Sequence, residues 1–447
     1  MERPGQGGQN ILVFIQKEVF MRIGLIGTGT VGGGVIEILE QKVEYFREAL
    51  GVNLELACIC AKTDEELAPF RDKYNVSTDA FAMIEDSSID VVVELAGGYE
   101  MPRRWLTAAL NNGKHVVTAN KALLAKYGHE LFPLAEEKDC HILFEAAVGG
   151  GIPIIRSLQE ALLGSSVERL SCIINGTCNY ILSRMSEAGL SFEDALKEAQ
   201  TKGFAEADPT FDIEGIDSAH KTALLASLCS DKHVDFEKIH VTGISQITAE
   251  DIATAADFGC TVKLLGIYHR VGDRVDARVH PCLLPKDHLL SSVNGVLNAV
   301  FLECDNLGPT LQTGAGAGRL PTASAVVADL VSLARSTDSG SRAVLPMGWF
   351  CKENEASLVP MEETCARYYF RFAAKDGCGV LASITGILAQ NEISIESIVQ
   401  KNVNDPGKVS IVVITEKILE RKAIAALEAI DALPNVVDKS RMIRFLM

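Results

Sequence analysis

The stretch that decides the fold of the first domain is MRIGLIGTGTVGGGVIEILE, residues 21–40. Its apolar run Arg22 to Ile26 predicts a β-strand, and the amphipathic pattern of Val31 to Leu50 predicts a helix. The loop between them reads GTGTVG, residues 27–32. Three glycines at this spacing let backbone N–H groups and a helix N-terminus approach a pyrophosphate, so the stretch predicts a dinucleotide-binding site.

The residues that follow continue the alternation of short apolar runs and amphipathic segments as far as about Val148. This order is typical of a parallel sheet with helical crossovers. We therefore predict an α/β fold whose first domain, residues 21–149, is a doubly wound Rossmann-type nucleotide-binding domain, completed by a return helix over residues 319–336. Its further strands and helix are expected at Leu54 to Ile59, Val91 to Leu95, His115 to Ala119, Ile142 to Glu145 and Leu123 to Glu137.

Length and composition limit the class of protein. A chain of 447 residues is long enough for three domains. Its net charge of −17 disfavours nucleic acid and anionic lipid as partners, and it has no apolar run of membrane-spanning length. The 12 cysteines follow no disulfide pattern. We therefore expect buried thiols and a cytoplasmic protein.

Two further domains are expected after the first. Residues 150–318 mix helical segments with β-prone runs, which predicts an α+β substrate and dimerisation domain. Residues 337–366 are expected to be a linker, because STDSGSR at 336–342 is polar and turn-forming. Residues 1–20 are either an upstream extension or a misassigned start. The strands expected in the second domain are Val262 to Val271, Arg274 to Cys282 and Ala299 to Cys304.

The last segment, residues 367–447, has the order strand, helix, strand, strand, helix, strand. This βαββαβ order predicts a small ferredoxin-like unit, with a hairpin turn at Asp405-Pro406-Gly407. Its elements are expected at Tyr368 to Ala373, Val380 to Gln390, Ile393 to Gln400, Val409 to Thr415, Ile418 to Ile430 and Met442 to Leu446.

Charged side chains on an apolar helical stripe are the strongest catalytic candidates. Asp217 and Lys221 are spaced i, i+4, and the same stripe continues through Leu224. An exposed ion pair would more often lie on a polar face, so the pair favours a pocket. The acids just before it, in residues 203–217, invite a cationic ligand, although some of them simply complement the helix dipole.

Two other lysines follow predicted strands. Lys121 comes just after a strand, and the carboxyl end of a parallel sheet normally faces its ligand. It is either functional or a surface lysine at a helix start. After the second strand, where an acid would bind the ribose of NAD, the sequence has Lys62, with Asp64 close by. Lys62 favours the 2′-phosphate of NADP slightly, and a solvated loop lysine is an equally good interpretation.

Six motifs follow one another over about residues 21 to 336: GLIGTGTVGGGV, VVTANKALLA, EAAVGGGIPII, NGTCNYIL, GFAEADPTFDIEGIDSAHK and TGAGAGRLPTASAVVADL. In this order they resemble the homoserine dehydrogenase family. The terminal KDGCGVLASITGILAQNEISIESIVQ resembles an ACT domain, a common amino-acid-sensing unit. No aspartokinase-like region precedes the dehydrogenase motifs, so a monofunctional enzyme is expected.

The resemblance implies reversible NAD(P)H-dependent reduction of L-aspartate 4-semialdehyde to L-homoserine. Lys221 would donate the proton to the aldehyde oxygen, with Lys121 also at the reaction centre. Substrate-binding residues would be Glu206, Asp217, Asp212, Gly176 and Thr177. Cofactor-binding residues would be Gly27, Thr28, Gly29, Thr30, Val31, Gly32, Lys62, Ala96, Gly97, Lys121 and Gly318.

The resemblance also implies a monovalent cation such as Na⁺, a threonine effector bound to the ACT domain, and a homodimer or homotetramer. The cation would be held mainly by backbone carbonyls of Glu145, Val148, Gly150 and Ile152, although a glycine-rich hinge without metal explains the segment equally well. Two departures from the family pattern are Cys178, where a second Thr is common, and Cys378, where ACT sequences commonly have Pro.

Two other functions fit the sequence less well. A semialdehyde dehydrogenase that forms a thioester needs an activated cysteine, and no cysteine has an obvious base partner in the sequence. An amino-acid sensor without activity would not need both Lys121 and Lys221.

Overall fold

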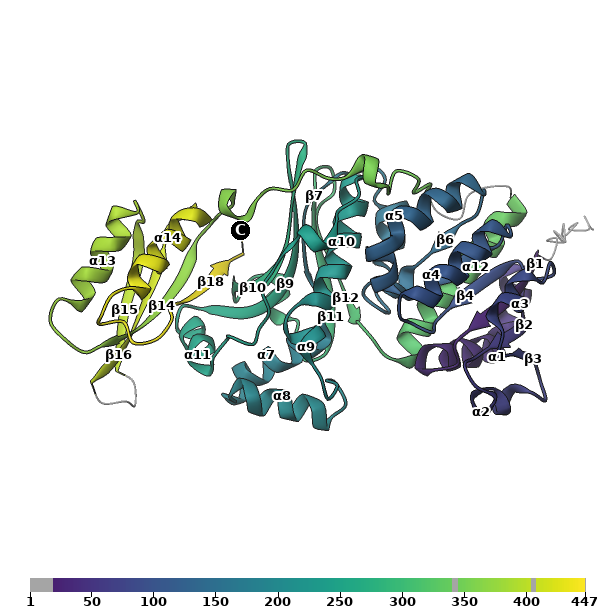
Figure 1. The fold of residues 1–447 in the computed structure, drawn as a ribbon, viewed down its shortest axis with the longest axis horizontal. Coiled ribbons are helices and arrows are strands. Elements are labelled where there is room, and N and C mark those ends of the chain that lie inside the picture. The colour runs from purple at the N-terminus through teal and green to yellow at the C-terminus, as the bar shows by residue number, and fades with distance from the viewer. Residues whose placement is uncertain (1–18, 340–344, 403–406, 447) are drawn as a thin grey trace, which may run out of the picture.

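The computed structural model describes residues 19–339, 345–402 and 407–446. Three parts follow one another along an elongated molecule (Figure 1). The nucleotide-binding part lies at one end, a large sheet with helices on one side lies in the middle, and the ACT-like part lies at the other end. No helix in the described ranges is long and apolar enough to cross a membrane.

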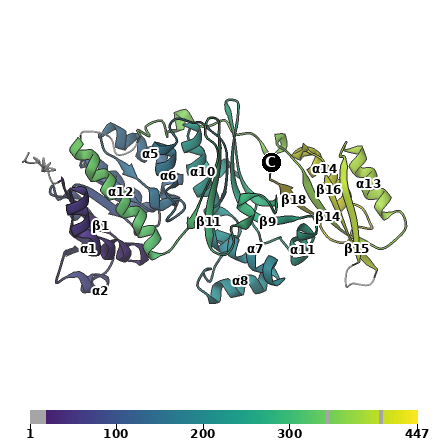
Figure 2. The ribbon, with the colours of Figure 1, turned by 180° about the vertical axis from the view of Figure 1, so that it is seen from behind.

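The first part is an open parallel sheet of strand order β3-β2-β1-β4-β5-β6, the doubly wound arrangement that the sequence predicts. The strands are β1 Val19–Ile26, β2 Val52–Cys60, β3 Asn75–Ser77, β4 Val91–Glu94, β5 His115–Thr118 and β6 Ile142–Leu143. The helices are α1 Thr30–Leu50, α2 Asp64–Leu67, α3 Ala80–Glu85, α4 Glu100–Asn111 and α5 Lys121–Glu137. The helix α12, Arg319–Ser339, returns from the middle part and packs along α1 (Figure 2).

The structure differs from the sequence prediction at several places in this part. β1 begins at Val19, because Val19 pairs with Val52 across the sheet. The short strand β3 was not predicted. β6 ends at Leu143, because Glu145 enters a 3₁₀ turn. α12 continues to Ser339, three residues into the expected linker, and the hydroxyl groups of Ser336 and Thr337 donate back to the carbonyl of Leu333 within it.

The middle part is built on a mixed sheet whose first five strands run in the order β12-β11-β7-β9-β10. Long apolar strands give it its core, and the three predicted strands lie within β9, β10 and β11. Its strands are β7 Val167–Ile173, β8 His240–Val241, β9 Cys260–Val271, β10 Arg274–Pro285, β11 Leu297–Cys304 and β12 Gly308–Ala315. Its helices are α6 Ile154–Arg156, α7 Gly176–Ala188, α8 Phe192–Thr201, α9 Thr210–Ile213, α10 Ile216–Ser230 and α11 Ala249–Asp257.

The terminal part has the predicted βαββαβ order. In the predicted turn, Asp405 and Pro406 lie outside the described residues, and Gly407 follows with a φ of +82°. The elements are β14 Tyr368–Lys375, α13 Val380–Gln390, β15 Ile395–Asn402, β16 Lys408–Thr415, α14 Glu420–Asp431 and β18 Arg441–Phe445, with the small pair β13 Cys365–Ala366 and β17 Ile418–Leu419.

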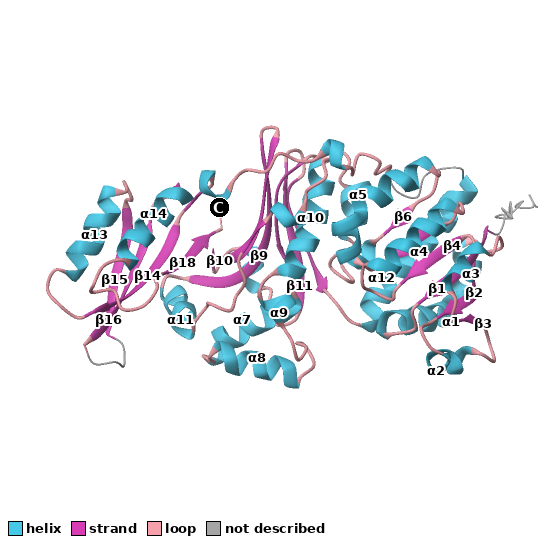
Figure 3. Cartoon of the chain, viewed as in Figure 1, coloured by secondary structure: helices cyan, strands magenta, loops and turns pink. Residues whose placement is uncertain are grey.

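The sheet of the terminal part is continuous with that of the middle part. β18 pairs in parallel with β10, where Cys282 lies opposite Arg444 and Leu283 opposite Phe445. Within the described chain the two parts therefore share one 10-stranded sheet (Figure 3). Arg444 also pairs with the buried Glu420. Backbone hydrogen bonds, together with a shared apolar core, fix the terminal part against the middle part.

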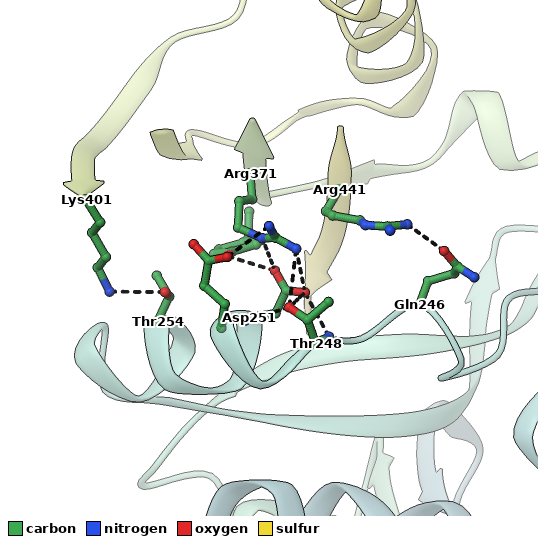
Figure 4. A network of polar contacts seen from close by, with 9 residues as sticks. Gln246, Thr248, Asp251, Thr254, Arg371, Lys401 and Arg441 are labelled. Carbon is green, nitrogen blue, oxygen red and sulfur yellow. Dashed lines mark hydrogen bonds and ion pairs between the residues drawn. The ribbon is translucent and has the colours of Figure 1, made fainter. Parts of the chain in front are cut away.

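A polar network on α11 adds to this junction (Figure 4). The guanidinium of Arg371, on β14, contacts the buried carboxylate of Asp251 at 2.6 Å and that of Glu250 at 3.1 Å. The hydroxyl of Tyr369 donates to Asp251 at 3.0 Å. Because Asp251 also caps its own helix through Thr248, the ACT-like sheet holds the first turn of α11.

Candidate active site between the first two domains

The glycine loop has the geometry of a phosphate-binding turn. Gly27 has a φ of +100°, and a Cβ on Gly32 would lie 2.0 Å from the carbonyl oxygen of Gly27. The first bond within α1 runs from the N–H of Gly33 to the carbonyl of Gly29, at 2.8 Å. The N–H groups of the preceding turn are therefore left for another acceptor. The partly or fully exposed residues of this turn are Gly27, Thr28, Gly29, Thr30 and Val31.

The loop after β4 lies beside the glycine loop and is held by Glu94. The N–H of Leu95 donates to the carbonyl of Ile26, at 2.8 Å. Glu94 is fully buried, and its carboxylate accepts from the N–H groups of Ala96 and Gly97 at 2.9 and 3.0 Å. These two predicted cofactor-binding residues are exposed, but their N–H groups are already used. Sequence analysis missed Glu94, which ends the apolar strand VVVE.

Lys62 lies just past the end of β2, whose Cys60 carbonyl accepts from the N–H of Gly27 at 2.8 Å. It is exposed at the position where a ribose 2′-substituent is expected. The neighbouring acid Asp64 pairs with Arg71. Asp64, the acid that could have bound the ribose in place of Lys62, is therefore already paired.

A buried carboxylate holds two lysines at the contact between α5 and α10. Lys221 Nζ lies 2.7 Å from Asp217 Oδ2, and Lys121 Nζ lies 3.2 Å from Asp217 Oδ1. Lys221 also donates to the carbonyl of Ile174, at 2.9 Å. Burial alone would raise the pKa of the Asp217 carboxyl, but the two ammonium groups outweigh it and lower that pKa to about 2. Asp217 is thus a negative charge between two lysine side chains.

Asn175, which sequence analysis did not select, organises the same centre. Its Oδ1 accepts from the N–H of Cys178 at 2.8 Å and so caps α7. Its Nδ2 is therefore turned toward two carboxylates, Asp212 at 2.7 Å and Asp217 at 2.9 Å. Burial raises the pKa of Asp212. An Asn between a strand and a helix is a capping signal, but nothing local in the sequence shows that its amide meets Asp217.

The other predicted substrate residues lie around α7. Gly176 is the first residue of α7, and Thr177 donates its hydroxyl to the carbonyl of Phe204 at 2.6 Å. Glu206 lies two residues beyond Phe204 and is exposed, with its main-chain carbonyl accepting from Gln200. Among the contacts of the described residues, none joins the Glu206 carboxylate to Asp217 or to either lysine.

The thiol of Cys178 lies beside Asp212 and Asp217. Burial raises the pKa of this thiol well above its ordinary value, and Asp212 and Asp217 raise it further. Its Sγ donates to the carbonyl of Asp212, at 3.1 Å. A thiol held in the protonated form by two carboxylates is the opposite of an activated nucleophile, which argues against a thioester mechanism at this centre.

The segment from Glu145 to Ile152 crosses from the first domain to the second. The Glu145 carboxylate accepts from the N–H groups of Ile155 and Arg156, each at 2.8 Å. The buried Asp329 lies beside it and accepts from the N–H of Glu145. Burial and the nearby Glu145 carboxylate raise the pKa of Asp329 to about 8. Two buried carboxyl groups therefore share one cation, Arg156, and the raised pKa of Asp329 keeps that carboxyl protonated at neutral pH.

The segment that returns from the second domain to α12 contacts the segment from Glu145 to Ile152. The N–H of Gly151 donates to the carbonyl of Ala315 at 2.9 Å, and a Cβ on Gly150 would lie 2.5 Å from the backbone of Gly316. Gly318, with a φ of +118°, then leads into α12. Close backbone contact explains Gly150, the Asn298 side chain explains Gly316, and the positive φ explains Gly318. The described residues contain no group of three or more His, Cys, Asp or Glu side chains arranged to hold a metal.

An open parallel sheet with a glycine loop, facing a lysine and carboxylate centre on a second domain, defines a nicotinamide-dependent oxidoreductase. Comparison with known proteins narrows this class. The family model described as homoserine dehydrogenase matches residues 153–331, and that of its NAD-binding domain matches residues 27–145. A model of the AHAS small subunit-like ACT domain matches residues 370–438.

Relatives and solved structures agree with these models. A homoserine dehydrogenase of Neisseria gonorrhoeae is 42% identical over 427 residues, which cover 94% of this chain and 98% of the relative. The crystal structure of a homoserine dehydrogenase from Thiobacillus denitrificans superposes with a TM-score of 0.90 at 43% identity, over 96% of this chain and 98% of that one. An archaeal homoserine dehydrogenase in complex with NADPH superposes with a TM-score of 0.60 at 30% identity, over 70% of this chain and 97% of that one. The chain belongs to the homoserine dehydrogenase family.

Proposed function

We propose that this chain interconverts L-aspartate 4-semialdehyde and L-homoserine with Lys221 as the proton-transfer group. The observation that carries the proposal is the buried Asp217, which contacts Lys221 on α10 and Lys121 on α5 at the same time. The bound nicotinamide cofactor supplies or accepts the hydride. The aldehyde oxygen gains negative charge during reduction, and Lys221 neutralises it by giving up a proton.

Lys121 and the carboxylates orient the substrate in this proposal. Lys121 lies at the start of α5, on the nucleotide-binding domain, where its ammonium adds positive charge beside the reacting oxygen. The substrate ammonium is bound by carboxylates, Glu206 and Asp217, with Asp212, Gly176 and Thr177 completing the pocket wall. The glycine loop and Gly318 hold the cofactor, and Lys62 gives a preference for NADP by pairing with its 2′-phosphate.

The test of the reaction is homoserine-dependent reduction of NADP and NAD by the purified protein and by Lys221→Ala. Lys197→Ala, at an exposed lysine on α8, is the matched control. We expect Lys221→Ala to lose at least about 100-fold in kcat, the usual range for removal of an acid or base, while the control keeps full activity. No turnover by the wild-type protein with either cofactor would refute the function.

The cofactor preference has its own test. Lys62→Ala should raise the KM for NADP by about 10-fold, equivalent to one charge-assisted contact. The KM for NAD should stay unchanged, because NAD has no 2′-phosphate. An equal change for both cofactors would mean that Lys62 only supports the loop.

We further propose that a monovalent cation binds the carbonyl groups of Glu145, Val148, Gly150 and Ile152. Support comes from the family-like motif EAAVGGGIPII and from a pocket that Glu145, Gly151 and Ile152 help to line. The Glu145 carboxylate itself is occupied by two N–H groups, which leaves backbone carbonyls as the ligands. Such a cation would stabilise the contact between the two domains. Thermal unfolding should move to higher temperature when Na⁺ replaces a large organic cation at equal ionic strength, and no shift would refute the site.

The regulatory proposal is that threonine binds the ACT domain of a cytoplasmic homodimer or homotetramer and inhibits the enzyme. The junction of β18 with β10 supports a direct route from the ACT sheet to the catalytic domain. Removal of residues from Tyr368 onward would also remove β18, which pairs with β10, and so is a poor test of the regulation. Threonine titration of the full chain, with light scattering for the oligomer, is the better one. Unchanged activity in millimolar threonine would refute the regulation.

A further inference from the structure

Lys263, on β9, is a buried lysine that the proposed reaction does not use. It is 1% exposed. Its ammonium donates to the Val293 carbonyl at 2.6 Å, to Asn294 Oδ1 at 2.8 Å and to Asn179 Oδ1 at 3.0 Å. None of these acceptors is a carboxylate. A buried charge with neutral partners is costly unless every donor is satisfied, and here three donors meet three acceptors.

Those acceptors tie the loop 293–297 to helix α7. Asn179, on α7, donates its own amide to the carbonyls of Val293 and Leu297, at 3.1 and 3.0 Å. One turn further along the same face, Ser183 accepts from the N–H of Gly295 at 3.1 Å. The loop is thus held at several points by α7 side chains and by Lys263 from the sheet below.

The same loop touches the catalytic centre. A Cβ on Gly176 would lie 2.8 Å from the carbonyl oxygen of Val296, so the loop packs directly against the first residue of α7. The preceding residue is Asn175, which donates to Asp217. Val296 and Leu297 are apolar yet 40% and 43% exposed, so the loop presents its side chains outward beside the start of α7.

We propose that Lys263 is a positioning residue for the substrate: its ammonium clamps loop 293–297 onto α7 and so fixes the Gly176 and Asn175 wall of the substrate pocket. The inference rests on the proposed function only for the identity of the substrate. The clamp acts on the pocket of the second domain and has no contact with the glycine loop. Its loss should therefore weaken homoserine binding and leave cofactor binding intact.

The test compares Lys263→Met, which keeps length and removes the charge, with Lys286→Met, at an exposed lysine just after β10. We expect Lys263→Met to raise the KM for homoserine at least about 10-fold, with the KM for the cofactor within about 2-fold and Lys286→Met unchanged. Ser183→Ala, which loosens the loop without touching Lys263, should shift the homoserine KM in the same direction. The Ser183→Ala variant therefore still tests the proposal if Lys263→Met does not fold.

Hydrogen exchange of the loop separates this inference from the proposed function, because it needs no turnover. Amides of residues 293–297 and of the first turn of α7 should exchange at least about 10-fold faster in Lys263→Met or Ser183→Ala than in the wild type. If the wild-type protein showed no turnover and the variants still exchanged faster than it does, the proposed function would be refuted and the clamp would stand. Unchanged exchange, or a lower melting temperature with an unchanged homoserine KM, would overturn the clamp.

Discussion

The charge of Asp217 is the part of the catalytic centre whose effect can be worked out from the structure. Its pKa falls from the ordinary 3.8 to about 2 in spite of burial, so its net interaction with its surroundings is worth about 2 kcal/mol. Both Lys221 and Lys121 contact this carboxylate. Asp217→Asn keeps the shape of the side chain but removes the charge. We therefore expect kcat/KM for homoserine to fall at least roughly 30-fold.

The assay is steady-state oxidation of homoserine by Asp217→Asn beside Asp208→Asn. Asp208 is an exposed carboxylate in the same acidic segment, and it contacts only Thr210 among the described residues. Both variants should bind cofactor as the wild type does, because neither touches the glycine loop. A folded Asp217→Asn enzyme with kcat/KM within about 3-fold of the wild type would refute the reasoning, since a loss of about 2 kcal/mol cannot be hidden in that range.

Three further outcomes follow from other parts of the molecule. Gly32→Ala should abolish cofactor binding by calorimetry, because its Cβ would meet the Gly27 carbonyl, whereas Gly29→Ala has open space and should fold normally. The Asp329 carboxyl keeps its proton up to about pH 8 in the folded chain and only to about pH 4 in the unfolded chain. The free energy of unfolding should therefore fall as the pH rises between these values. In Asp329→Asn the melting temperature should depend less on pH over this range. Arg371→Met leaves Asp251 buried without its cation and should cost about 3 kcal/mol in urea unfolding.

Short-range patterns were sufficient for the parts of the fold that depend on neighbouring residues. The glycine loop was predicted because strand, turn and helix follow one another directly. Lys221 and Asp217 were predicted as a pair because one helical turn separates them. The contact of Lys121 with Asp217 was not predicted from the residues, although the family resemblance placed both at the reaction centre.

The missed features depend on contacts between distant segments. Asn175 and Lys263 have local explanations in the sequence, as a helix cap and as an ordinary strand lysine, and only the fold brings them to Asp217 and to loop 293–297. The strand β12 was missed because its glycines resemble a loop, and pairing with β11 overrides that tendency. The pairing of β18 with β10 joins two domains, and no periodicity within either strand shows it.

That pairing sets an order of events during synthesis. β10 leaves the ribosome long before β18, so its edge must wait for a strand from the far end of the chain. During this interval the N–H and C=O groups of the β10 edge are open to any other extended segment. A nascent chain that stops before Arg441 lacks β18. Its β10 edge would therefore stay unpaired, next to apolar residues such as Leu283. Incomplete chains are therefore expected to be substrates for chaperones and proteases rather than partly active enzymes.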